Sequence, residues 1–379
     1  MRQPPIRIAL IGYGFMGRAH SYALNVATRL FSDPSVVQLS ILCGPNQERA
    51  ENFGAIWGWR EFVNDWQHVV DRDDVDAIVI TAPNVLHAPI AKAALKNGKH
   101  VYCEKPLANT LADAQAMTDI AKKSGRVNMV GFNYRRVPAI ALARELVMAG
   151  QLGQIYHFRA QYLQNWGARE STPYSWRFSR EMAGSGALGD LGSHVIDLAR
   201  YLVGEFREIS GQLKTFITSR TSADTSSGTL VTVDDSAIFS ARFRCGATGS
   251  FEVSRVAMGR ANSLQFEISG TQGCLSFNLE RLNELSVCRA NDNPLDGPKR
   301  VLVTNESHPY IQAWWPDGHV LGWDATVVHA MHDWIGAMAT NSVVLPDFEE
   351  GLRCQAVINA VVQSAETRSF VEIAGNDGE

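Results

Sequence analysis

Five short apolar runs, separated by amphipathic segments of helical length, occupy the first third of the chain. They are rich in Val and Ile and lie at residues 6–11, 36–43, 77–81, 100–103 and 127–132. Strands that are buried on both faces of a parallel sheet are continuously apolar in this way. Because the runs alternate with helical segments, the pattern predicts an α/β domain, a doubly wound Rossmann sheet, over residues 1–132.

The second part of the chain has longer runs that are joined by turn signals such as RCGATG and GTQGC. These runs lie at residues 155–164, 209–217, 235–244, 247–256, 262–269, 273–278 and 284–289. Alternating runs with short turns are typical of antiparallel strands. We therefore expect residues 133–379 to form an α+β domain with a large, mainly antiparallel open sheet. The polar stretch 218–230 is predicted to be a surface loop.

Composition narrows the class of protein. The 379 residues are 45% hydrophobic and 20% charged, which is typical of a soluble globular chain of about two domains. The net charge of -4 gives no basic excess that would neutralise nucleic-acid phosphates. The six cysteines form no C-x-x-C pair, and neither a signal peptide nor an apolar run of membrane length is recognisable. We expect a cytoplasmic protein with no nucleic-acid or membrane partner.

The first apolar run leads directly into a G-x-G-x-x-G motif. It comprises Gly12, Gly14 and Gly17, with Phe15 and Met16 at the start of the following helix. In such a turn the first glycine permits the tight bend, the second lets a pyrophosphate approach the backbone, and the third allows close helix packing. The helix amides then face the phosphates. The motif predicts a dinucleotide-binding site.

The end of the second run is where the adenosine ribose is recognised. An acidic residue there would bind the 2′-hydroxyl and repel a 2′-phosphate, but Cys43 is followed by Gly44. Arg49 lies about one helical turn further on, where a solvated helix residue explains it as well as phosphate binding does. We expect NAD as the cofactor and leave NADP open.

Residues that follow the third and fourth runs lie at the sheet edge where ligands bind. The predicted cofactor neighbours there are Thr81, Pro83, Asn84, His87, Glu104 and Lys105. A helix-start histidine without a ligand explains His87 equally well. Pro106 restricts the backbone of Lys105, so we expect a lysine that is held in place. Taken alone, Lys105 is better explained as part of a surface Lys-Pro turn.

A predicted helix over residues 187–202 carries Asp190, His194 and Asp197 on one face, because positions i, i+4 and i+7 align. Burial of these side chains without partners would be costly. A metal ion is one explanation of the Asp190–His194 spacing, although no third ligand has a fitting spacing. A structural pair satisfied within the fold is a second explanation, and a substrate cavity is a third.

These motifs occur together in an order that resembles one family. The glycine motif is followed by TAPNVLHAPIAKAAL, GKHVYCEKPLA, GFNYRR, GSGALGDLGSHVIDLARYLVGE and, more loosely, LPDFEEGLRCQAVINAVVQSA. Over nearly its whole length the chain resembles the Gfo/Idh/MocA oxidoreductases. The segments YLQNW and SWRF are similar to those of its sugar and cyclitol dehydrogenases, of the levoglucosan dehydrogenase and scyllo-inositol dehydrogenase type.

The resemblance implies catalytic roles for Lys105, Asp190 and His194. Oxidation of an alcohol needs a base for the hydroxyl proton, and histidine suits this role because its unperturbed pKa is about 6.5. We therefore expect His194 to be the base. Lys105 would stabilise the developing alkoxide and would repel a metal cation. Asp190 would bind a substrate hydroxyl or hold the imidazole, and Asp197 is assigned to structural hydrogen bonds.

The same resemblance, with the residue types that suit a polyol ring, gives a substrate-binding set. Its members are Lys105, Tyr134, Gln164, Trp166, Trp176, Arg177, Asp190, His194 and His319, with Arg135 beside Tyr134. Donors and acceptors would meet the ring hydroxyls, and aromatic side chains would meet its C–H faces. Trp176 is equally well explained as a core residue. His319 is included as a residue that would reach a ring hydroxyl in a neighbouring subunit's cavity. Taken alone, it is better explained as an exposed loop histidine.

The predicted function is an NAD(P)-dependent dehydrogenase that oxidises a ring secondary hydroxyl to a ketone. Its small-molecule substrate would be a cyclitol or a pyranose, such as scyllo- or myo-inositol, a hexose or levoglucosan. A nucleotide-binding sugar sensor or co-regulator without turnover is one alternative, and a redox-assisted glycosidase is another. The resemblance implies a homotetramer, in which we expect an apolar outer face of the second sheet to be covered by another subunit.

Overall fold

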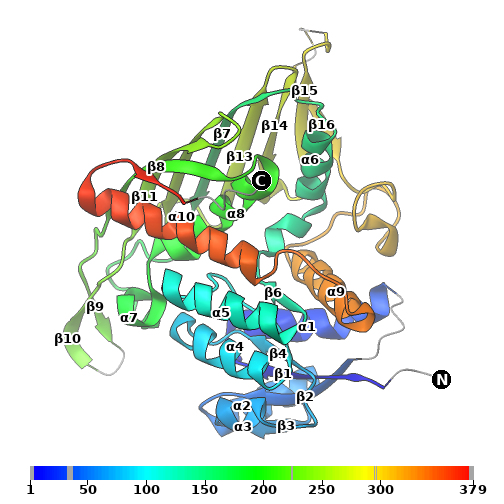
Figure 1. The fold of residues 1–379 in the computed structure, drawn as a ribbon, viewed down its shortest axis with the longest axis vertical. Coiled ribbons are helices and arrows are strands. Elements are labelled where there is room, and N and C mark those ends of the chain that lie inside the picture. Colours follow the sequence, from blue (N-terminus) through cyan, green and yellow to red (C-terminus); the bar gives the residue numbers. More distant parts are fainter. Residues whose placement is uncertain (1–3, 32–36, 223–224, 294, 296, 375–379) are drawn as a thin grey trace. The chain divides into compact units, whose positions relative to one another are not determined.

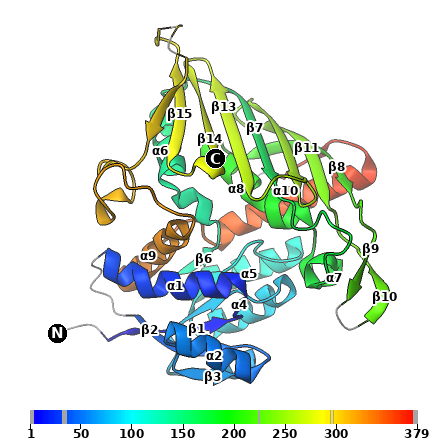
Figure 2. The same cartoon turned by 180° about the vertical axis from the view of Figure 1, so that it is seen from behind.

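The computed structural model describes residues 4–31, 37–222, 225–293, 295 and 297–374, and its contacts divide the chain into two units (Figures 1 and 2). Unit 1 comprises Met1–Asn133 and Gly322–Gln355, and unit 2 comprises Tyr134–Leu321 and Ala356–Glu379. The predicted domains placed residues 322–355 with the second part of the chain. They belong to unit 1 because the helix α9 (Asp324–Thr340) packs against α1 (Phe15–Leu30).

Within the described residues, unit 1 contains a six-stranded parallel sheet in the order β3-β2-β1-β4-β5-β6. Its strands are β1 (Ile6–Ile11), β2 (Val37–Cys43), β3 (Glu61–Val63), β4 (Ala77–Ile80), β5 (His100–Cys103) and β6 (Asn128–Val130). The residues of β4 and those at 8–11 of β1 are at most 3% exposed, which explains their continuously apolar sequence. The predicted Rossmann sheet is therefore confirmed. Residue 36, its predicted second-strand start, lies outside the described residues.

Helices cover both faces of this sheet, with α4 and α5 in front in Figure 1 and α1 in front in Figure 2. The remaining helices of unit 1 are α2 (Gln47–Trp57), α3 (Trp66–Val70), α4 (His87–Lys96), α5 (Leu111–Ser124) and the first turns of α10 (Phe348–Thr367). Side chains at the caps fix several starts: Asn46, Asp65 and Thr110 each accept a backbone N–H of the helix that follows.

In the described part of unit 2, nine strands form one sheet in the order β16-β15-β14-β13-β7-β12-β11-β8-β17. They are β7 (Ile155–Leu163), β8 (Phe206–Lys214), β11 (Ser236–Phe243), β12 (Thr248–Ser254), β13 (Ser263–Gly270), β14 (Gly273–Asn278), β15 (Glu284–Arg289), β16 (Lys299–Leu302) and β17 (Val371–Glu372). Neighbouring strands are antiparallel except β7 and β12. The predicted mainly antiparallel sheet is confirmed.

The inner face of this sheet carries the core of unit 2. Phe158, Phe239, Phe251 and Phe266 are at most 3% exposed. Their rings form a row, with Phe239 and Phe251 stacked at 4.5 Å and Phe158 and Phe266 stacked at 5.8 Å. The helices α6 (Pro138–Met148) and α8 (Ser193–Leu202) contact the sheet at β14, β15 and β7. This packing fixes the helix that carries His194.

The outer face of the sheet is polar, so the prediction of an apolar outer face is wrong. Arg159 and Glu267 form an ion pair there at 2.7 Å, with side chains 53% and 48% exposed. Along β11 and β12 the outward positions are Ile238, Ser240, Arg242, Thr248, Ser250 and Glu252. Alternation along these strands sends most apolar residues to the inner face and leaves mainly polar side chains on the other, where Ile238 is an exposed apolar exception.

Two local predictions also differ from the structure. The stretch 218–230 is not a plain loop, because β9 (Ser219–Ser222) and β10 (Thr225–Leu230) form an antiparallel pair in which Arg220 is 1% exposed. Residues 223 and 224 lie outside the described residues. The predicted helix 187–202 begins with a π-helical turn, Leu188–Gly192, before α8.

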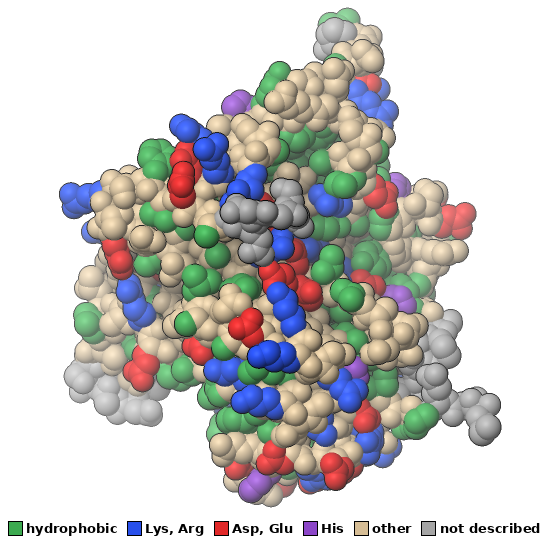
Figure 3. Space-filling model, in the orientation of Figure 1, with side chains coloured by type: hydrophobic (Ala, Val, Ile, Leu, Met, Phe, Trp, Pro, Cys, Tyr) green, Lys and Arg blue, Asp and Glu red, His purple; other side chains and the backbone are tan. Residues whose placement is uncertain are grey.

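The face of the molecule drawn in Figure 3 is mixed in charge. On the face shown in Figure 3, basic and acidic side chains lie intermingled, in keeping with the net charge of -4. Among the helices of the described ranges, none is both long and apolar enough to cross a membrane.

Candidate active site

The turn after β1 has the backbone that a dinucleotide needs. Gly12 has a φ of +102°, and a Cβ there would lie 2.8 Å from the backbone of Thr81 and Ala82. A Cβ at Gly17 would lie 2.4 Å from the carbonyl oxygen of Gly12. At Gly14, in contrast, a Cβ would meet no protein atom within 4 Å. Protein packing therefore requires the first and third glycines, whereas the second leaves an open approach that fits a pyrophosphate.

The start of α1 supplies the donors for such a group. The helix begins at Phe15, with Gly14 as its N-cap and no side-chain cap. The first N–H groups of a helix have no partner inside it, and they lie at the positive end of the helix dipole. Phe15 is 60% exposed and its ring stacks at 5.4 Å on Trp323. These residues fit NAD, and Phe15 and Met16 would face its phosphates with their backbone.

The end of β2 explains why no acidic residue follows Cys43. A Cβ at Gly44 would lie 2.0 Å from the ring of Tyr13, so that ring fills the space of a side chain. The Tyr13 hydroxyl accepts the N–H of Asn46 at 2.9 Å, and the guanidinium of Arg49 lies 5.8 Å from the Tyr13 ring centroid. Burial raises the pKa of the Cys43 thiol to about 12, so it remains protonated. Arg49 therefore has a contact within the protein.

His87 is tied to the backbone at the ends of two strands. It is 1% exposed, with Nδ1 2.9 Å from the Pro106 carbonyl and Nε2 3.1 Å from the Ala82 carbonyl. Burial lowers its pKa, which favours the neutral ring. This arrangement favours a role in shaping the turn over direct contact with the cofactor. Pro83 and Asn84, which are half-buried in the same turn, remain candidates for that contact.

Lys105 is anchored through its neighbours. His20 Nε2 lies 2.7 Å from Glu104 Oε1, and both residues are buried. The other carboxylate oxygen of Glu104 accepts the backbone N–H of Lys105 at 3.2 Å. The peptide bond between Lys105 and Pro106 is cis. The backbone of this lysine is thus fixed on one side by the His20–Glu104 pair. The sequence analysis did not identify His20. Its one indication there is the position of a histidine three residues after Gly17, in the helix that follows the glycine motif.

In unit 2 a polar and aromatic group surrounds His194, which is 6% exposed. The His194 ring lies 4.6 Å from that of Tyr134 and 5.9 Å from that of Tyr162. The two tyrosine hydroxyls are 2.9 Å apart. Asn262 Oδ1 accepts from the Tyr162 hydroxyl and from the Gln164 amide, each at 2.7 Å. The structure thus brings together Tyr134, Gln164 and His194 from the predicted substrate-binding set.

The hydrogen bonds of this group have a direction. Tyr162 has one hydroxyl proton and donates it to Asn262, so the Tyr134 hydroxyl is the donor to Tyr162. The pKa of Tyr162 lies well above its usual range, first through burial and then through Tyr134 and the negative charge of Asp190. Sequence reasoning missed Tyr162 and Asn262. Tyr162 lies near the end of β7 and two residues before Gln164, which directly follows the strand, and this spacing in an extended chain is the indication that both share a face.

Asp190 lies within the π-helical turn, so the simple helical register assumed between Asp190 and His194 does not hold. Asp197, in the regular helix, forms a buried ion pair with Arg135. Arg135 Nη2 lies 2.6 Å from one carboxylate oxygen of Asp197, and Arg135 Nε lies 2.9 Å from the other. The structural role predicted for Asp197 is therefore confirmed, and Arg135 is its partner.

The other predicted substrate residues lie in separate surroundings. Trp166 is half-buried and its ring packs 5.5 Å from that of Phe178. Trp176 is half-buried, with the guanidinium of the exposed Arg177 4.5 Å from its ring centroid. His319 is exposed, and its Nδ1 lies 2.7 Å from the backbone carbonyl three residues earlier. Within unit 2 these contacts do not join His319 to the His194 group.

Across the ranges that the structure describes, no three His, Cys, Asp or Glu side chains are grouped as a metal site. The six cysteines are free thiols.

Comparison with known proteins gives one consistent result. Residues 6–132 match the oxidoreductase family with an NAD-binding Rossmann fold, and residues 140–276 match the GFO/IDH/MocA C-terminal domain. Levoglucosan dehydrogenase of Pseudarthrobacter phenanthrenivorans is 40% identical over 97% of this chain and 98% of its own. The scyllo-inositol 2-dehydrogenase (NAD(+)) of Bacillus subtilis is 27% identical over 77% and 79%.

Solved structures of similar proteins have the same fold as this chain. A levoglucosan dehydrogenase in complex with NADH and L-sorbose superimposes with a TM-score of 0.95 at 40% identity, over 98% of this chain and 100% of that one. An oxidoreductase domain protein from Kribbella flavida gives 0.95 at 45% identity over the same shares.

Proposed function

This chain belongs to the Gfo/Idh/MocA family of NAD-binding oxidoreductases, and on that premise we propose that it oxidises one ring secondary hydroxyl of a sugar or cyclitol to the ketone. A pyranose such as levoglucosan or a hexose is the first candidate substrate, because a relative at 40% identity carries that activity in its name. Scyllo- and myo-inositol are the second, because a more distant relative acts on an inositol.

The observation that carries the proposal is the group of side chains around His194. The Tyr134 ring lies against that of His194, and hydrogen bonds to Tyr162 and Asn262 hold the Tyr134 hydroxyl and the Gln164 amide. The Asp190 carboxylate lies close enough to Tyr162 to raise the pKa of that hydroxyl. Hydroxyl, amide and carboxylate groups thus accompany the imidazole. Polyol rings present several hydroxyls, each of which donates and accepts. A site with buried polar groups discriminates against analogues that lack the matching hydroxyl, because its own groups would be left unpaired.

The residues divide the work of the reaction. His194 takes the hydroxyl proton, because a neutral imidazole is a base near physiological pH. Lys105 stabilises the developing alkoxide with its positive charge. Asp190 orients the substrate or the imidazole of His194. NAD, when bound, supplies the hydride acceptor, and its phosphates are held by the turn at Gly12 and Gly14.

The test is incubation of the purified protein with levoglucosan, glucose, myo-inositol and scyllo-inositol, each with NAD and with NADP. Reduced nicotinamide is followed by its absorbance. The proposal predicts its steady accumulation with at least one of these substrates. Binding of a sugar with no accumulation would favour the sensor, and cleavage of a glycoside with no accumulation would favour the redox-assisted glycosidase.

We further propose a homotetramer in the cytoplasm. The polar outer face of the nine-stranded sheet, with Arg159 and Glu267 exposed, would then be joined by hydrogen bonds and ion pairs between subunits rather than by apolar packing. His319, which is exposed, would be available to a neighbouring subunit's site. Sedimentation at micromolar concentration tests this assembly, and a monomeric mass would refute both it and the role of His319.

A further inference from the structure

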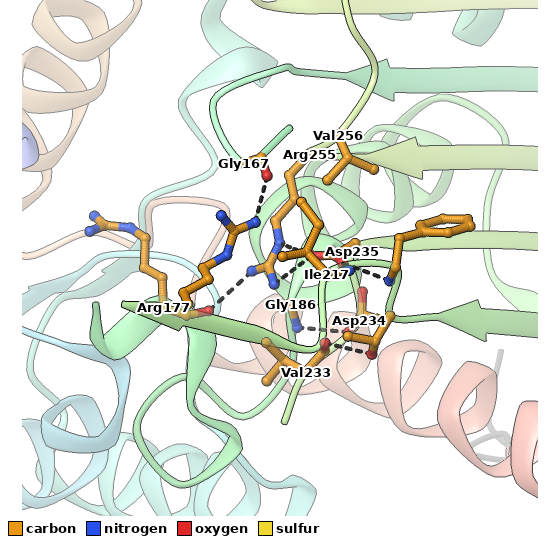
Figure 4. Close-up of polar contacts among 12 residues, drawn as sticks. Gly167, Arg177, Gly186, Ile217, Val233, Asp234, Asp235, Arg255 and Val256 are labelled. Atoms are coloured by element: carbon orange, nitrogen blue, oxygen red, sulfur yellow. Dashed lines mark hydrogen bonds and ion pairs between the residues drawn. The ribbon is translucent and has the colours of Figure 1, made fainter. Parts of the chain in front are cut away.

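Two adjacent carboxylates, Asp234 and Asp235, lie immediately before β11 in the interior of unit 2. They are 7% and 0% exposed, and neither belongs to the site described above. Their side chains make contacts in different directions. The contacts of Asp234 lead toward Gly186, and those of Asp235 lead toward Arg255, which in turn reaches Arg177 (Figure 4).

Asp234 holds the beginning of the acid–base segment, residues 187–202, which carries Asp190 and His194. Its carboxylate accepts the N–H of Gly186 at 2.7 Å and that of Leu188 at 2.8 Å. Its backbone carbonyl accepts the N–H of Ala187 at 3.0 Å. Three consecutive N–H groups at the start of a helical segment, which have no partner inside it, are thus bound by one residue.

The approach is so close that only glycine fits. A Cβ at Gly186 would lie 1.8 Å from the carbonyl oxygen of Asp234. Burial raises the pKa of Asp234, against the opposing effect of the Leu188 and Gly186 N–H groups. The two backbone donors therefore favour the charged form of this buried carboxylate. Asp190 follows only two residues after Leu188, so a shift of this anchor moves Asp190 directly.

Asp235 acts on a different segment through Arg255. This recognition segment, residues 164–178, carries Gln164 and the predicted substrate residues Trp166, Trp176 and Arg177. Asp235 is paired with Arg255, which is 1% exposed, through Nε and Nη2 at 3.0 Å each. Its second oxygen accepts two backbone N–H groups, those of Phe216 and Ile217, at 2.8 and 2.9 Å. Arg255 then donates from Nη1 to the carbonyl of Arg177 at 3.1 Å.

Arg255 also holds the other end of the recognition segment. Its backbone carbonyl accepts the N–H of Gly167 at 3.0 Å. The Phe178 ring contacts two guanidinium groups, that of Arg255 at 4.6 Å and that of Arg220 at 4.2 Å from its centroid. Arg220 in turn donates to the carbonyls of Gly167 and Arg169. The backbone that presents Trp166, Trp176 and Arg177 is thus fastened at both ends to the Asp235–Arg255 pair.

We propose that Asp234 and Asp235 are positioning residues with separate effects on the dehydrogenase: Asp234 sets the acid–base segment, and Asp235, through Arg255, sets the recognition segment. The inference rests on the proposed function for its kinetic readout. Neither carboxylate is a catalytic residue, since Asp234 acts through backbone groups of the acid–base segment and Asp235 acts through Arg255.

The two roles predict a split between kcat and KM. Asp234→Asn keeps one acceptor and turns an NH2 group toward a backbone N–H, so the acid–base segment shifts. Displacement of reacting groups by about 1 Å lowers rate by up to ~100-fold, and we expect kcat to fall about 10- to 100-fold with KM nearly unchanged. Asp235→Asn removes the charge that holds Arg255, so the recognition segment loosens, and we expect KM to rise about tenfold with kcat within about twofold.

Gly186→Ala is a second, independent variant for the first role, because its Cβ displaces the same segment from Asp234. It should reproduce the kcat effect without touching the carboxylate. Asp76→Asn is the matched control: Asp76 is bound by Arg7 at 2.7 Å in unit 1, outside both segments, and this variant should keep kcat and KM.

Hydrogen exchange gives a readout that does not depend on turnover. Asp234→Asn should speed exchange in peptides covering residues 186–194, and Asp235→Asn in those covering 165–178 and 216–217. The proposal is overturned if both variants change kcat and KM in the same ratio, or if exchange rises throughout unit 2 in either. If the wild-type protein oxidises no sugar or cyclitol, the proposed function fails. Faster exchange confined to the expected segments would still support the roles of Asp234 and Asp235. Faster exchange spread evenly over unit 2 would refute these roles.

Discussion

The buried ion pair between Arg135 and Asp197 gives a direct prediction about stability. Its side chains are 6% and 2% exposed, and two guanidinium nitrogens contact the carboxylate at 2.6 to 3.1 Å. Asp197→Asn keeps the shape, so no cavity forms, but it leaves the charge of Arg135 buried without its counterion. Loss of one partner from such a pair costs about 3–5 kcal/mol. We expect the lower value, because the guanidinium also lies 4.8 Å from the Tyr201 ring centroid.

Thermal and urea unfolding measure this effect. A loss of about 3 kcal/mol corresponds to roughly 6–12 °C in Tm for a domain of about 150–250 residues. Glu267→Gln is the control, because the Arg159–Glu267 pair has a similar distance of 2.7 Å but is about half exposed. It should cost at most about 1 kcal/mol. Replacement of both buried partners, Arg135→Met with Asp197→Leu, should cost less than Asp197→Asn alone.

Equal and small changes of Tm in Asp197→Asn and Glu267→Gln would contradict this prediction. In that case burial would not decide the strength of the pair. A double variant less stable than Asp197→Asn would also contradict it, because the penalty would then lie in packing rather than in an unpaired charge.

Three further predictions concern unit 1. Gly14→Ala should weaken NADH binding in a fluorescence titration but keep Tm, because its Cβ would meet no protein atom within 4 Å. Gly12→Ala should lower both Tm and the affinity for NADH, because the φ of Gly12 is +102°. Burial first, and then Arg126, lowers the pKa of His100 to about 4. The stability that the neutral His100 ring contributes is therefore complete above about pH 6.5 and is lost as the pH falls toward 4. A plot of Tm against pH should be flatter over this range in His100→Asn. NAD should be preferred to NADP, and Arg49→Ala should change the kcat/KM ratio of the two cofactors by less than threefold (about 0.7 kcal/mol); an NADP preference of about tenfold or more would contradict this.

Much of unit 1 follows from the sequence because its signals are local. A continuously apolar run at residues 6–11, followed by Gly12, Gly14 and Gly17, determines a strand, a turn and a helix within a few residues. The membership of residues 322–355 in this unit was not predictable in that way. It depends on the packing of α9 against α1, two helices that are about 300 residues apart in the chain.

In unit 2 the missed features depend on partners that are distant in sequence. The pattern of 218–230 is polar and small, and only the carbonyl groups of Gly167 and Arg169 explain why Arg220 is buried there. The π-helical turn at Leu188–Gly192 starts where Asp234 binds the backbone, and no local pattern encodes that contact.

The residues around His194 divide in the same way. Asp190 and His194 stand out because polar groups are unusual in an apolar helix. Tyr162 does not, because an aromatic residue in a strand is ordinarily assigned to the core. Its hydrogen bonds to Tyr134 and Asn262 become evident only when β7 and the residues before β13 are seen together.

The most direct test of the account is the steady-state kinetics of His194→Ala with the substrate that the wild-type protein oxidises, together with titration of NADH. If His194 is the base, kcat falls by about 10²- to 10⁴-fold, the acidic limb of the pH profile disappears, and the affinity for NADH stays within about twofold because unit 1 holds the cofactor. Retention of more than about a tenth of the wild-type kcat with that acidic limb intact would contradict the account and assign the proton to another group, with Asp190 and Tyr134 next in line.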